Sequence, residues 1–308
     1  MAAITAKMVS DLRAKTGVGM MDCKKALSEA NGDFDEAVKI LREKGLSVAA
    51  KKAGRIAAEG VVDIMVDGNT AVMIEVNAET DFVAKNETFK EFVRGIERAI
   101  LSGKPATTEE LLALPYDDSF TVDAKLKDMI FTIGENMNIR RFVIVEGIFS
   151  TYSHGAGTTG VIVKFNTDAD VAAKDGFAEV AKNIALQIAA GSPPSYVSRD
   201  EVPATAVEEE KQVLLAQIKN DEKNANKPEN ILEKMIVGKL GKFYERECLV
   251  EQAYVKDDDI SVGKYLENAG KELGGTIAVD SFYLYEKGEG LEKREDNFGD
   301  EIAEMLNK

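Results

Sequence analysis

The sequence predicts an α+β fold in which one unit, a β-hairpin followed by a helix, occurs twice. Three observations support this prediction. Short amphipathic helices open the chain, a hairpin-plus-helix pattern begins near residue 60, and the same pattern returns near residue 147. A stretch of helical periodicity interrupts the second copy, and a short amphipathic segment ends the chain. We therefore expect an N-terminal three-helix unit, a duplicated hairpin-plus-helix (β/α) core, an inserted antiparallel helical hairpin and a C-terminal helix.

These elements divide the chain into four parts. We expect them at residues 1–54, 55–146, 147–285 and 286–308, with the helical hairpin inserted at about 200–245.

The composition is typical of a globular protein and argues against several classes of ligand. The chain has 308 residues, of which 44% are hydrophobic and 30% charged, and its formal net charge is −15. Phosphate backbones repel such a surface, so we expect no stable nucleic-acid binding and no membrane binding. No apolar run approaches the roughly 18 residues that cross a bilayer, and the N-terminus lacks the layout of a signal peptide. We expect a cytoplasmic protein.

Residues suited to metal or nucleophilic chemistry are few and far apart. Cys23 and Cys248 are the only cysteines, and His154 is the only histidine. This pattern predicts no disulfide framework, no metal site, no cofactor and no catalytic constellation, so we expect a binding protein and not an enzyme. The competing interpretation is an acidic enzyme that uses a metal. Against it, the acidic runs 208–210 and 257–259 are typical of solvated faces.

The first 45 residues predict three short helices. Asp33 and Glu36 have the spacing of a capping box at the start of the third helix, and Gly45 is expected to follow its end. Met20 and Met21 lie at the start of the second helix. Two interpretations of this pair stay open. Both side chains fill the small core, which is the more frequent case, or they form an adaptable contact surface.

The first hairpin-plus-helix unit contains a phenylalanine in a polar turn. Residues 61–66 and 70–76 alternate as two strands, and Asp67-Gly68-Asn69 between them is typical of a tight hairpin turn. A helix is expected at about 87–101. The segment Thr80-Asp81-Phe82-Val83 connects the second strand to this helix. Connections on a rigid scaffold often carry function, so we interpret this turn as the working tip of a binding module.

The second unit repeats this order over residues 147–188, with one informative difference. When the copies are aligned, Asp81 falls on Asp170. A shared aspartate is expected to have a structural role, as a turn or cap residue. At the next position Phe82 of the first copy falls on Val171 of the second. The large aromatic side chain is therefore the feature by which the first copy differs.

Two further helical segments complete the chain. Helical periodicity at about 202–220 and 231–243, with a short polar turn between them, predicts an antiparallel helical hairpin that protrudes as an arm. At the end of the chain Phe298, Ile302 and Met305 follow a helical spacing. This last helix is too short to be stable alone in water, so it docks either on its own core or on a partner.

Several segments, in order and at matching spacing, resemble the bacterial elongation factor Ts family over essentially the whole chain. They are residues 16–27 (TGVGMMDCKKAL), 29–33 (EANGD), 50–54 (AKKAG), 75–77 (EVN), 80–85 (TDFVAK), 133–136 (IGEN) and 138–141 (NIRR). The inserted hairpin and the C-terminal segment match the long form of this family. The resemblance implies that the three N-terminal helices form a UBA-like domain.

The resemblance also implies an activity, which is guanine-nucleotide exchange on the GTPase elongation factor Tu. In the family, the turn that matches Thr80, Asp81, Phe82 and Val83 enters the GTPase near its Mg²⁺ site. Phe82 wedges between side chains there and Asp81 supports the contact. Mg²⁺ and then GDP are lost, so that GTP can bind. The alternative is a scaffold or chaperone that binds the GTPase without exchange.

Other contact residues are expected from the same resemblance. The N-terminal helices and the C-terminal helix grip the nucleotide-binding domain of the GTPase, and the duplicated core contacts its third domain. The partner-binding candidates are Met20, Met21, Ile133, Gly134, Glu135, Asn136, His154, Ile302 and Met305. For His154, in the glycine-rich turn of the second hairpin, an ordinary loop position is the alternative.

Overall fold

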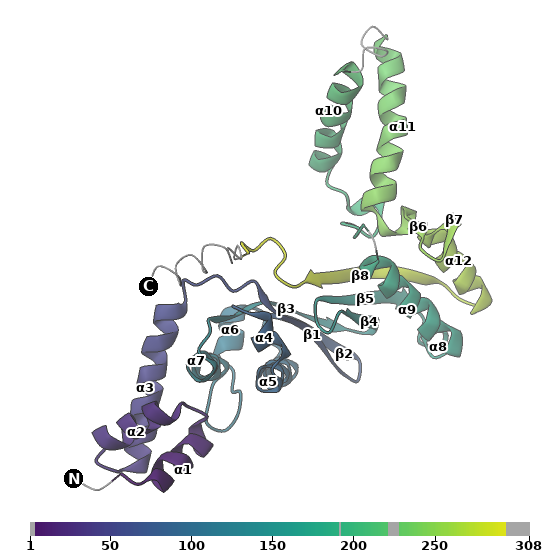
Figure 1. Ribbon diagram of the computed structural model, residues 1–308. Helices are drawn as coiled ribbons and strands as arrows, with labels where there is room; N and C mark the ends of the chain where they lie inside the picture. Colours follow the sequence, from purple (N-terminus) through teal and green to yellow (C-terminus); the bar gives the residue numbers. More distant parts are fainter. Residues whose placement is uncertain (1–3, 191, 221–227, 294–308) are drawn as a thin grey trace.

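Two three-stranded antiparallel sheets form the centre of the molecule (Figure 1). The computed structural model describes residues 4–190, 192–220 and 228–293. The strand orders are β1-β2-β3 and β4-β5-β8. Figure 1 shows the N-terminal helices at one end of the molecule and a helical arm that extends away from the second sheet. The predicted α+β class is confirmed.

The N-terminal unit contains three helices, α1 (Ala6–Thr16), α2 (Met20–Glu29) and α3 (Phe34–Lys52). The Thr5 hydroxyl caps α1, and the Asp33 carboxylate accepts a hydrogen bond from the backbone N–H of Glu36 at 2.9 Å, which confirms the predicted cap of α3. The small core between the helices is formed mainly by Leu12 and Leu27, which are fully buried.

The prediction that Gly45 follows the third helix is wrong. Gly45 lies inside α3 and is buried against α7 (Val122–Ile133). A Cβ atom at this position would lie 3.5 Å from the ring of Phe131 on α7. That distance is an ordinary van der Waals contact, so the packing of α3 on α7 does not itself require glycine here. The helix continues through Gly45 although glycine costs about 1 kcal/mol inside a helix.

The first copy of the repeated unit follows. Its elements are β1 (Glu59–Asp67), β2 (Thr70–Ala78), the short helix α4 (Asp81–Lys85), α5 (Glu87–Gly103) and, after α6 (Thr108–Ala113) and α7, the strand β3 (Met137–Glu146). The predicted turn at residues 80–83 is thus mostly one turn of helix. The apolar face of α5, with Phe89, Phe92 and Ile96 fully or almost fully buried, packs on the sheet.

The second copy has the same elements in the same order. They are β4 (Ile148–His154), β5 (Thr159–Thr167), α8 (Ala169–Ala172), α9 (Asp175–Ala189) and β8 (Ile277–Glu286). Both copies also share an irregularity. The pairing of β2 with β3 shifts between Glu75 and Val76, and that of β5 with β8 shifts between Lys164 and Phe165. These are matching positions in the alignment of the two copies.

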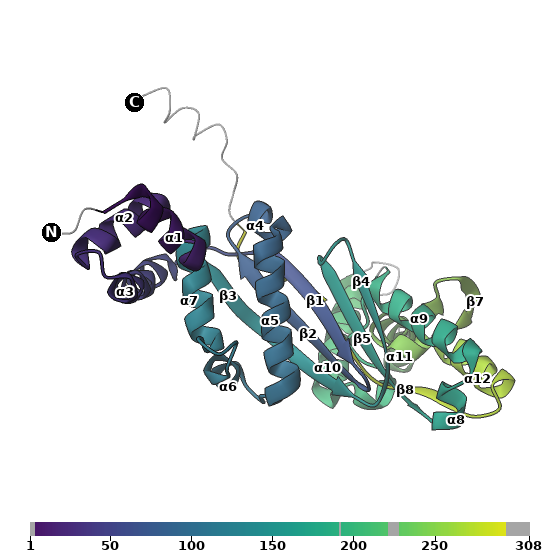
Figure 2. The same ribbon diagram turned by 90° about the horizontal axis from the view of Figure 1, so that it is seen from below.

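The two sheets pack against each other through their inner faces. Val62, Met73 and Ile162 are fully buried in this contact. Figure 2 shows α5 along the first sheet and α9 along the second, so each sheet has a helix on its other face. The duplicated core therefore consists of two hairpin-plus-helix layers with apolar side chains between and under them.

The arm consists of α10 (Ala204–Asn220) and α11 (Glu229–Glu247), preceded by η1 (Arg199–Glu201). After it the chain returns through η2 (Leu249–Glu251), β6 (Ala253–Tyr254), β7 (Asp257–Ser261) and α12 (Val262–Glu272) to β8. Part of the predicted turn of the arm, and the predicted C-terminal helix, lie outside the described residues. None of the described helices is both long and apolar enough to cross a membrane. The limits of the four predicted parts stay predictions.

We expect deletion of residues 202–243 to leave the two sheets folded. The arm has its own hydrophobic cluster, and its two ends are already joined at the base. The backbone N–H of Ser195 donates to the carbonyl of Glu247 at 2.9 Å, and that of Leu249 to the carbonyl of Tyr196 at 2.9 Å. A short Gly-Ser linker in place of the arm should leave one cooperative thermal transition. Loss of that transition would contradict the insertion.

A second test concerns Glu97 on α5, whose carboxyl group is fully buried and whose two oxygens have no hydrogen-bond partner among the described residues. Burial, together with the charge of Asp63 on β1, raises the pKa of Glu97 to about 9. The folded protein therefore keeps this proton at neutral pH, whereas the unfolded chain releases it above pH 4.5. The free energy of unfolding must then fall as the pH rises from about 4.5 to about 9.

Glu97→Gln should remove this dependence. At pH 5 the variant and the wild type should have nearly equal free energies of unfolding, and at pH 7 the variant should be more stable by about 3 kcal/mol. Urea denaturation at pH 5, 7 and 8.5 measures the difference. Glu29→Gln, at an exposed position, is the control and should show no change. Equal slopes against pH for Glu97→Gln and the wild type would show that Glu97 is ionised in the folded protein.

Candidate functional site

Phe82 is the most exposed large hydrophobic side chain in the described part of the chain, with 81% of its surface accessible. It lies on α4, in the connection between β2 and α5. The matching residue of the second copy, Val171 on α8, is only 3% exposed and belongs to the core of that copy. The same position of the repeated unit therefore points inward in one copy and outward in the other.

Helix α4 is anchored through the residues that follow Phe82. Val83 and Ala84 are 6% and 8% exposed and pack into the core of the first copy, together with Phe89. The Thr80 hydroxyl caps the helix by accepting from the backbone N–H of Val83 at 3.5 Å. Because its neighbours are buried, Phe82 must project from the opposite side of this single helical turn.

A reciprocal set of hydrogen bonds braces the turn against the segment after α7. The backbone N–H and the hydroxyl of Thr80 donate to the two carboxylate oxygens of Glu135, at 3.0 and 2.7 Å. In the other direction, the backbone N–H of Asn136 donates to the carboxylate of Glu79 at 2.6 Å. The Asn136 amide also donates to the carbonyl of Arg55 at 2.8 Å. Each segment thus supplies a carboxylate for the backbone of the other; we call these hydrogen bonds between residues 79–80 and 135–136 the brace.

The other two residues of the 133–136 segment, Ile133 and Gly134, fix the position of Glu135 and Asn136 at the end of α7. Gly134 ends α7 in the left-handed conformation, with φ +87°, and its carbonyl accepts a hydrogen bond from the ammonium group of Lys52. Ile133 is half-buried and packs on the core of the first copy. The segment that the sequence indicates as a contact region is therefore engaged largely within the chain, where it supports the Phe82 turn.

A negative charge stands beside the exposed ring. The Asp81 carboxylate accepts a hydrogen bond from the Lys85 ammonium group at 2.6 Å, one helical turn further on. This hydrogen bond holds the pKa of Asp81 below its ordinary value, so the group is ionised at neutral pH. Both side chains are exposed to solvent, and such a pair contributes little to stability. Asp81 is thus available to a partner at small cost.

A hollow opens beside Phe82. It is lined by Ile56, Ala58, Glu59, Glu79, Thr80, Asp81, Phe82 and Lys293. Four of these eight residues are charged and three are apolar, which suits protein side chains better than a buried organic cofactor. Among the described residues, no group of three or more histidine, cysteine, aspartate or glutamate side chains has an arrangement that holds a metal ion.

The remaining predicted contact residues lie elsewhere. Met20 and Met21 are 56% and 66% exposed, so the interpretation that both fill the small core is wrong; Leu12, Cys23 and Leu27 fill it instead. His154 ends β4, where its Nδ1 atom lies 3.0 Å from the Tyr152 hydroxyl. Figure 1 shows α2 near the N-terminal end of the molecule and β4 in the second copy, so neither is brought next to α4.

Four more residues bear on the site, two that the sequence analysis predicted and two that it did not. Ile302 and Met305 lie outside the described residues. Sequence reasoning missed Glu79 and Arg55, which form an ion pair with an N–O distance of 3.4 Å beside the brace. No motif marks these residues. The one usable signal was the position of Glu79 directly before the capping threonine.

We expect Glu135→Gln to loosen the Phe82 turn without unfolding the protein. Glutamine offers one acceptor where Thr80 presents two donors, so one hydrogen bond to a charged group is lost; such bonds contribute about 1.5–3 kcal/mol. Amide hydrogen exchange in residues 80–85 should become at least about tenfold faster, with little change in the second copy. Glu109→Gln, at an exposed site on α6, is the control. Unchanged exchange at residues 80–85 would show that the brace does not hold the turn.

The chain is similar to known proteins over nearly its whole length. A model of the family described as Elongation factor TS matches residues 79–289, which include α4, the brace, β3 of the first sheet and all three strands of the second sheet. The protein named Elongation factor Ts from Syntrophotalea carbinolica is 49% identical over 306 residues, covering 98% of this chain and 99% of that protein. Those of Clostridium kluyveri and Clostridium botulinum are each 44% identical, with 99% of each covered.

Proposed function

This chain belongs to the elongation factor Ts family, and from that premise we propose that it is a guanine-nucleotide exchange factor for elongation factor Tu in translation elongation. It binds the GTPase in its GDP state, disturbs the Mg²⁺ and phosphate site, and releases GDP so that GTP can bind. The observation that carries this proposal is the exposed ring of Phe82 on a turn that is anchored and braced from behind.

The geometry of α4 suits insertion into a partner. The ring is already in water, so binding requires no internal rearrangement to free it. The brace limits the conformational entropy that the turn loses when it is held by the GTPase, because the turn is ordered beforehand. Phe82 then enters an apolar gap near the Mg²⁺ site of the GTPase, and the ionised Asp81 beside it supports the contact. Thr80 and Val83 hold the ring in place from the protein side.

The energies show that the ring does not act alone. A thousandfold acceleration of GDP release requires about 4 kcal/mol of differential stabilisation. Burial of one phenylalanine side chain contributes about 1.5–3 kcal/mol. The rest must come from displaced Mg²⁺ and phosphate ligands and from a wide interface that favours the nucleotide-free state. Because coupling between sites is reciprocal, bound nucleotide must weaken the affinity for this protein by the same factor.

The other contact residues have separate parts in this proposal. Met20 and Met21, exposed at the start of α2, form an adaptable surface for the nucleotide-binding domain of the GTPase, with Ile302 and Met305 contributing from the end of the chain. His154 contacts the third domain. Ile133, Gly134, Glu135 and Asn136 act mainly through the brace. No proton transfer or covalent step is needed at any of them.

Phe82→Ala tests the proposal directly. We expect the variant to bind elongation factor Tu but to accelerate release of mantGDP at least tenfold less than the wild type at saturation, because the ring no longer enters the Mg²⁺ region. The control is Val66→Ala, which removes an exposed apolar side chain at the other end of β1 and should leave the rate unchanged.

Two results would contradict parts of the proposal. An unchanged rate for Phe82→Ala would refute insertion of the ring. Binding of the wild type without any acceleration of release would refute exchange and would leave a scaffold or chaperone as the function.

A further inference from the structure

The chain crosses from the second copy back to the first directly after β8. Residues 287–293, which we call the strap, lie against the start of β1 and the end of β2. The backbone N–H of Gly288 donates to the carboxylate of Glu75 on β2 at 2.8 Å. Lys287 forms an ion pair with Glu59 on β1, and its backbone N–H donates to the carbonyl of Thr158 at 2.8 Å. The strap therefore ties the two copies together.

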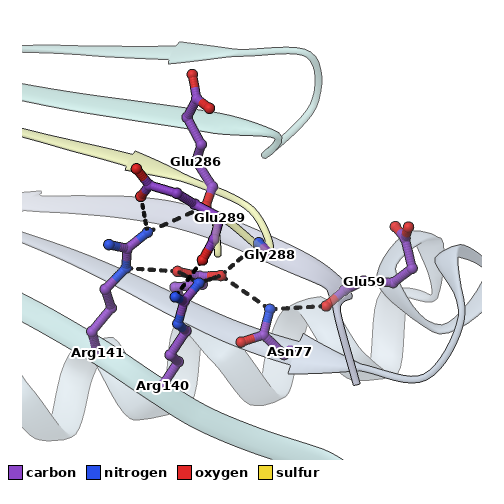
Figure 3. A network of polar contacts seen from close by, with 8 residues as sticks. Glu59, Asn77, Arg140, Arg141, Glu286, Gly288 and Glu289 are labelled. Atoms are coloured by element: carbon purple, nitrogen blue, oxygen red, sulfur yellow. Dashed lines mark hydrogen bonds and ion pairs between the residues drawn. The ribbon is translucent and has the colours of Figure 1, made fainter. Parts of the chain in front are cut away.

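Glu75 is the centre of this tie. Its side chain is fully buried, and Figure 3 shows the donors that converge on it. Besides Gly288, the donors are Asn77 at 3.0 Å, Arg140 at 3.0 Å and the Nε atom of Arg141 at 2.7 Å. Burial by itself raises the pKa of Glu75, but these hydrogen bonds outweigh it and hold the pKa below its ordinary value. The acceptor capacity of the carboxylate is filled.

The same two arginines also hold the strap. The guanidinium group of Arg140 donates to the carbonyl of Glu289. That of Arg141 donates to the Glu289 carboxylate at 3.0 Å and to the Glu286 carbonyl at 3.2 Å. Figure 3 shows both arginines between the first sheet and the end of β8. Loss of the Glu75 charge would leave Arg140 and Arg141 without their shared counter-ion, and Arg141 would keep only the carboxylate of Glu289 as an ion-pair partner among the described residues.

The strap fits only with glycine at its closest approach. Gly288 has φ +69°, and a Cβ atom there would lie 2.3 Å from the carbonyl oxygen of Ala58. Ala58 and Glu59 line the hollow beside Phe82, and Lys293 at the end of the strap lines the same hollow. The contact at Gly288 therefore determines where one wall of the hollow lies relative to the exposed ring.

The second copy has no such arrangement at the matching position. Lys164 occupies the position of Glu75 and pairs with Asp280 of β8 at 3.3 Å, with both side chains about 40% exposed or more. The buried carboxylate is thus a property of the copy that carries the exposed phenylalanine. The repeated unit therefore folds without a buried carboxylate at this position, and its presence goes with the exposed phenylalanine.

We propose that Glu75 is a positioning residue for the Phe82 site. Its carboxylate holds the strap against the start of β1, so that Lys293 and the wall formed by Ala58 and Glu59 stand beside Phe82 as one rigid contact surface. The inference rests on the proposed function for its kinetic consequence. It adds that the strap contributes to the affinity for the GTPase, whereas Phe82 contributes to the maximal rate of nucleotide release.

Two variants test this inference. Glu75→Gln removes the charge at nearly constant volume, and Gly288→Ala prevents the close approach of the strap without changing any charge. Both should increase amide hydrogen exchange in residues 286–293 by at least about tenfold. Gly288→Ala moves the Gly288 N–H away from the Glu75 carboxylate, and Glu75→Gln leaves one acceptor oxygen where two now serve Gly288, Asn77 and the two arginines. Lys164→Gln is the matched control at the corresponding position of the second copy and should leave exchange in this segment unchanged.

The kinetic measurement is a titration of mantGDP release from elongation factor Tu. For Glu75→Gln and Gly288→Ala we expect the concentration for half-maximal acceleration to rise at least about fivefold, with the maximal rate within twofold of the wild type. Phe82→Ala should instead lower the maximal rate and leave the concentration for half-maximal acceleration nearly unchanged. A loss of stability alone would lower the active fraction in proportion, and thermal unfolding curves of each variant measure that loss.

Two outcomes overturn the inference when both variants fold. Unchanged hydrogen exchange of the strap in Gly288→Ala and Glu75→Gln means that Glu75 does not hold it. Faster strap exchange with unchanged kinetics means that the strap is no part of the site. If Glu75→Gln does not fold, Gly288→Ala decides alone. If the wild type does not accelerate GDP release, the proposed function fails. Calorimetric affinities of the wild type and the variants for the GTPase then replace the kinetic constant. Equal affinities of wild type and variants overturn the inference separately.

Discussion

The brace between Thr80 and Glu135, with its return hydrogen bond from Asn136 to Glu79, is the constraint on which the candidate site depends. An aromatic ring in water gains free energy by folding back onto its own protein, and a free turn of this length could do so. The brace removes that freedom, because it ties the start of the turn to the segment after α7, while Val83 and Ala84 anchor the rest of the turn in the core. It converts an unfavourable exposure into a fixed contact surface.

Duplication explains how the protein carries such a surface without losing its core. Both copies have the same strands, the same irregular pairing and the same short helix, and the second copy shows the ordinary use of these positions. There Val171 is buried and Lys164 forms a half-exposed pair. In the first copy these positions hold Phe82 and Glu75. Each copy nevertheless keeps its own buried core on the same arrangement of strands and helices.

Two buried carboxyl groups of the first copy show how partners decide protonation. Glu75 and Glu97 are both fully buried. Glu75 accepts hydrogen bonds from four residues, two of them arginines, and these outweigh the cost of desolvation. Glu97 has no hydrogen-bond partner among the described residues and faces the charge of Asp63, so desolvation prevails and its pKa rises to about 9. Glu75 is thus a buried carboxylate that connects two segments of the chain. Glu97 is a buried neutral carboxylic acid, and it lowers the free energy of unfolding more as the pH rises.

The local features of this protein follow from its sequence, and the long-range ones do not. Alternation, helical spacing and the capping-box pattern predicted the two hairpins, the helices of the arm and the cap at Asp33, because these depend on residues a few positions apart. The inward position of Gly45, the exposure of Met20 and the role of Glu135 depend on side chains that meet only after folding. The contact of Gly288 with Glu75 joins residues 213 positions apart, and no periodicity encodes it. Packing between distant segments alone decided where the exposed ring stands and what holds it there.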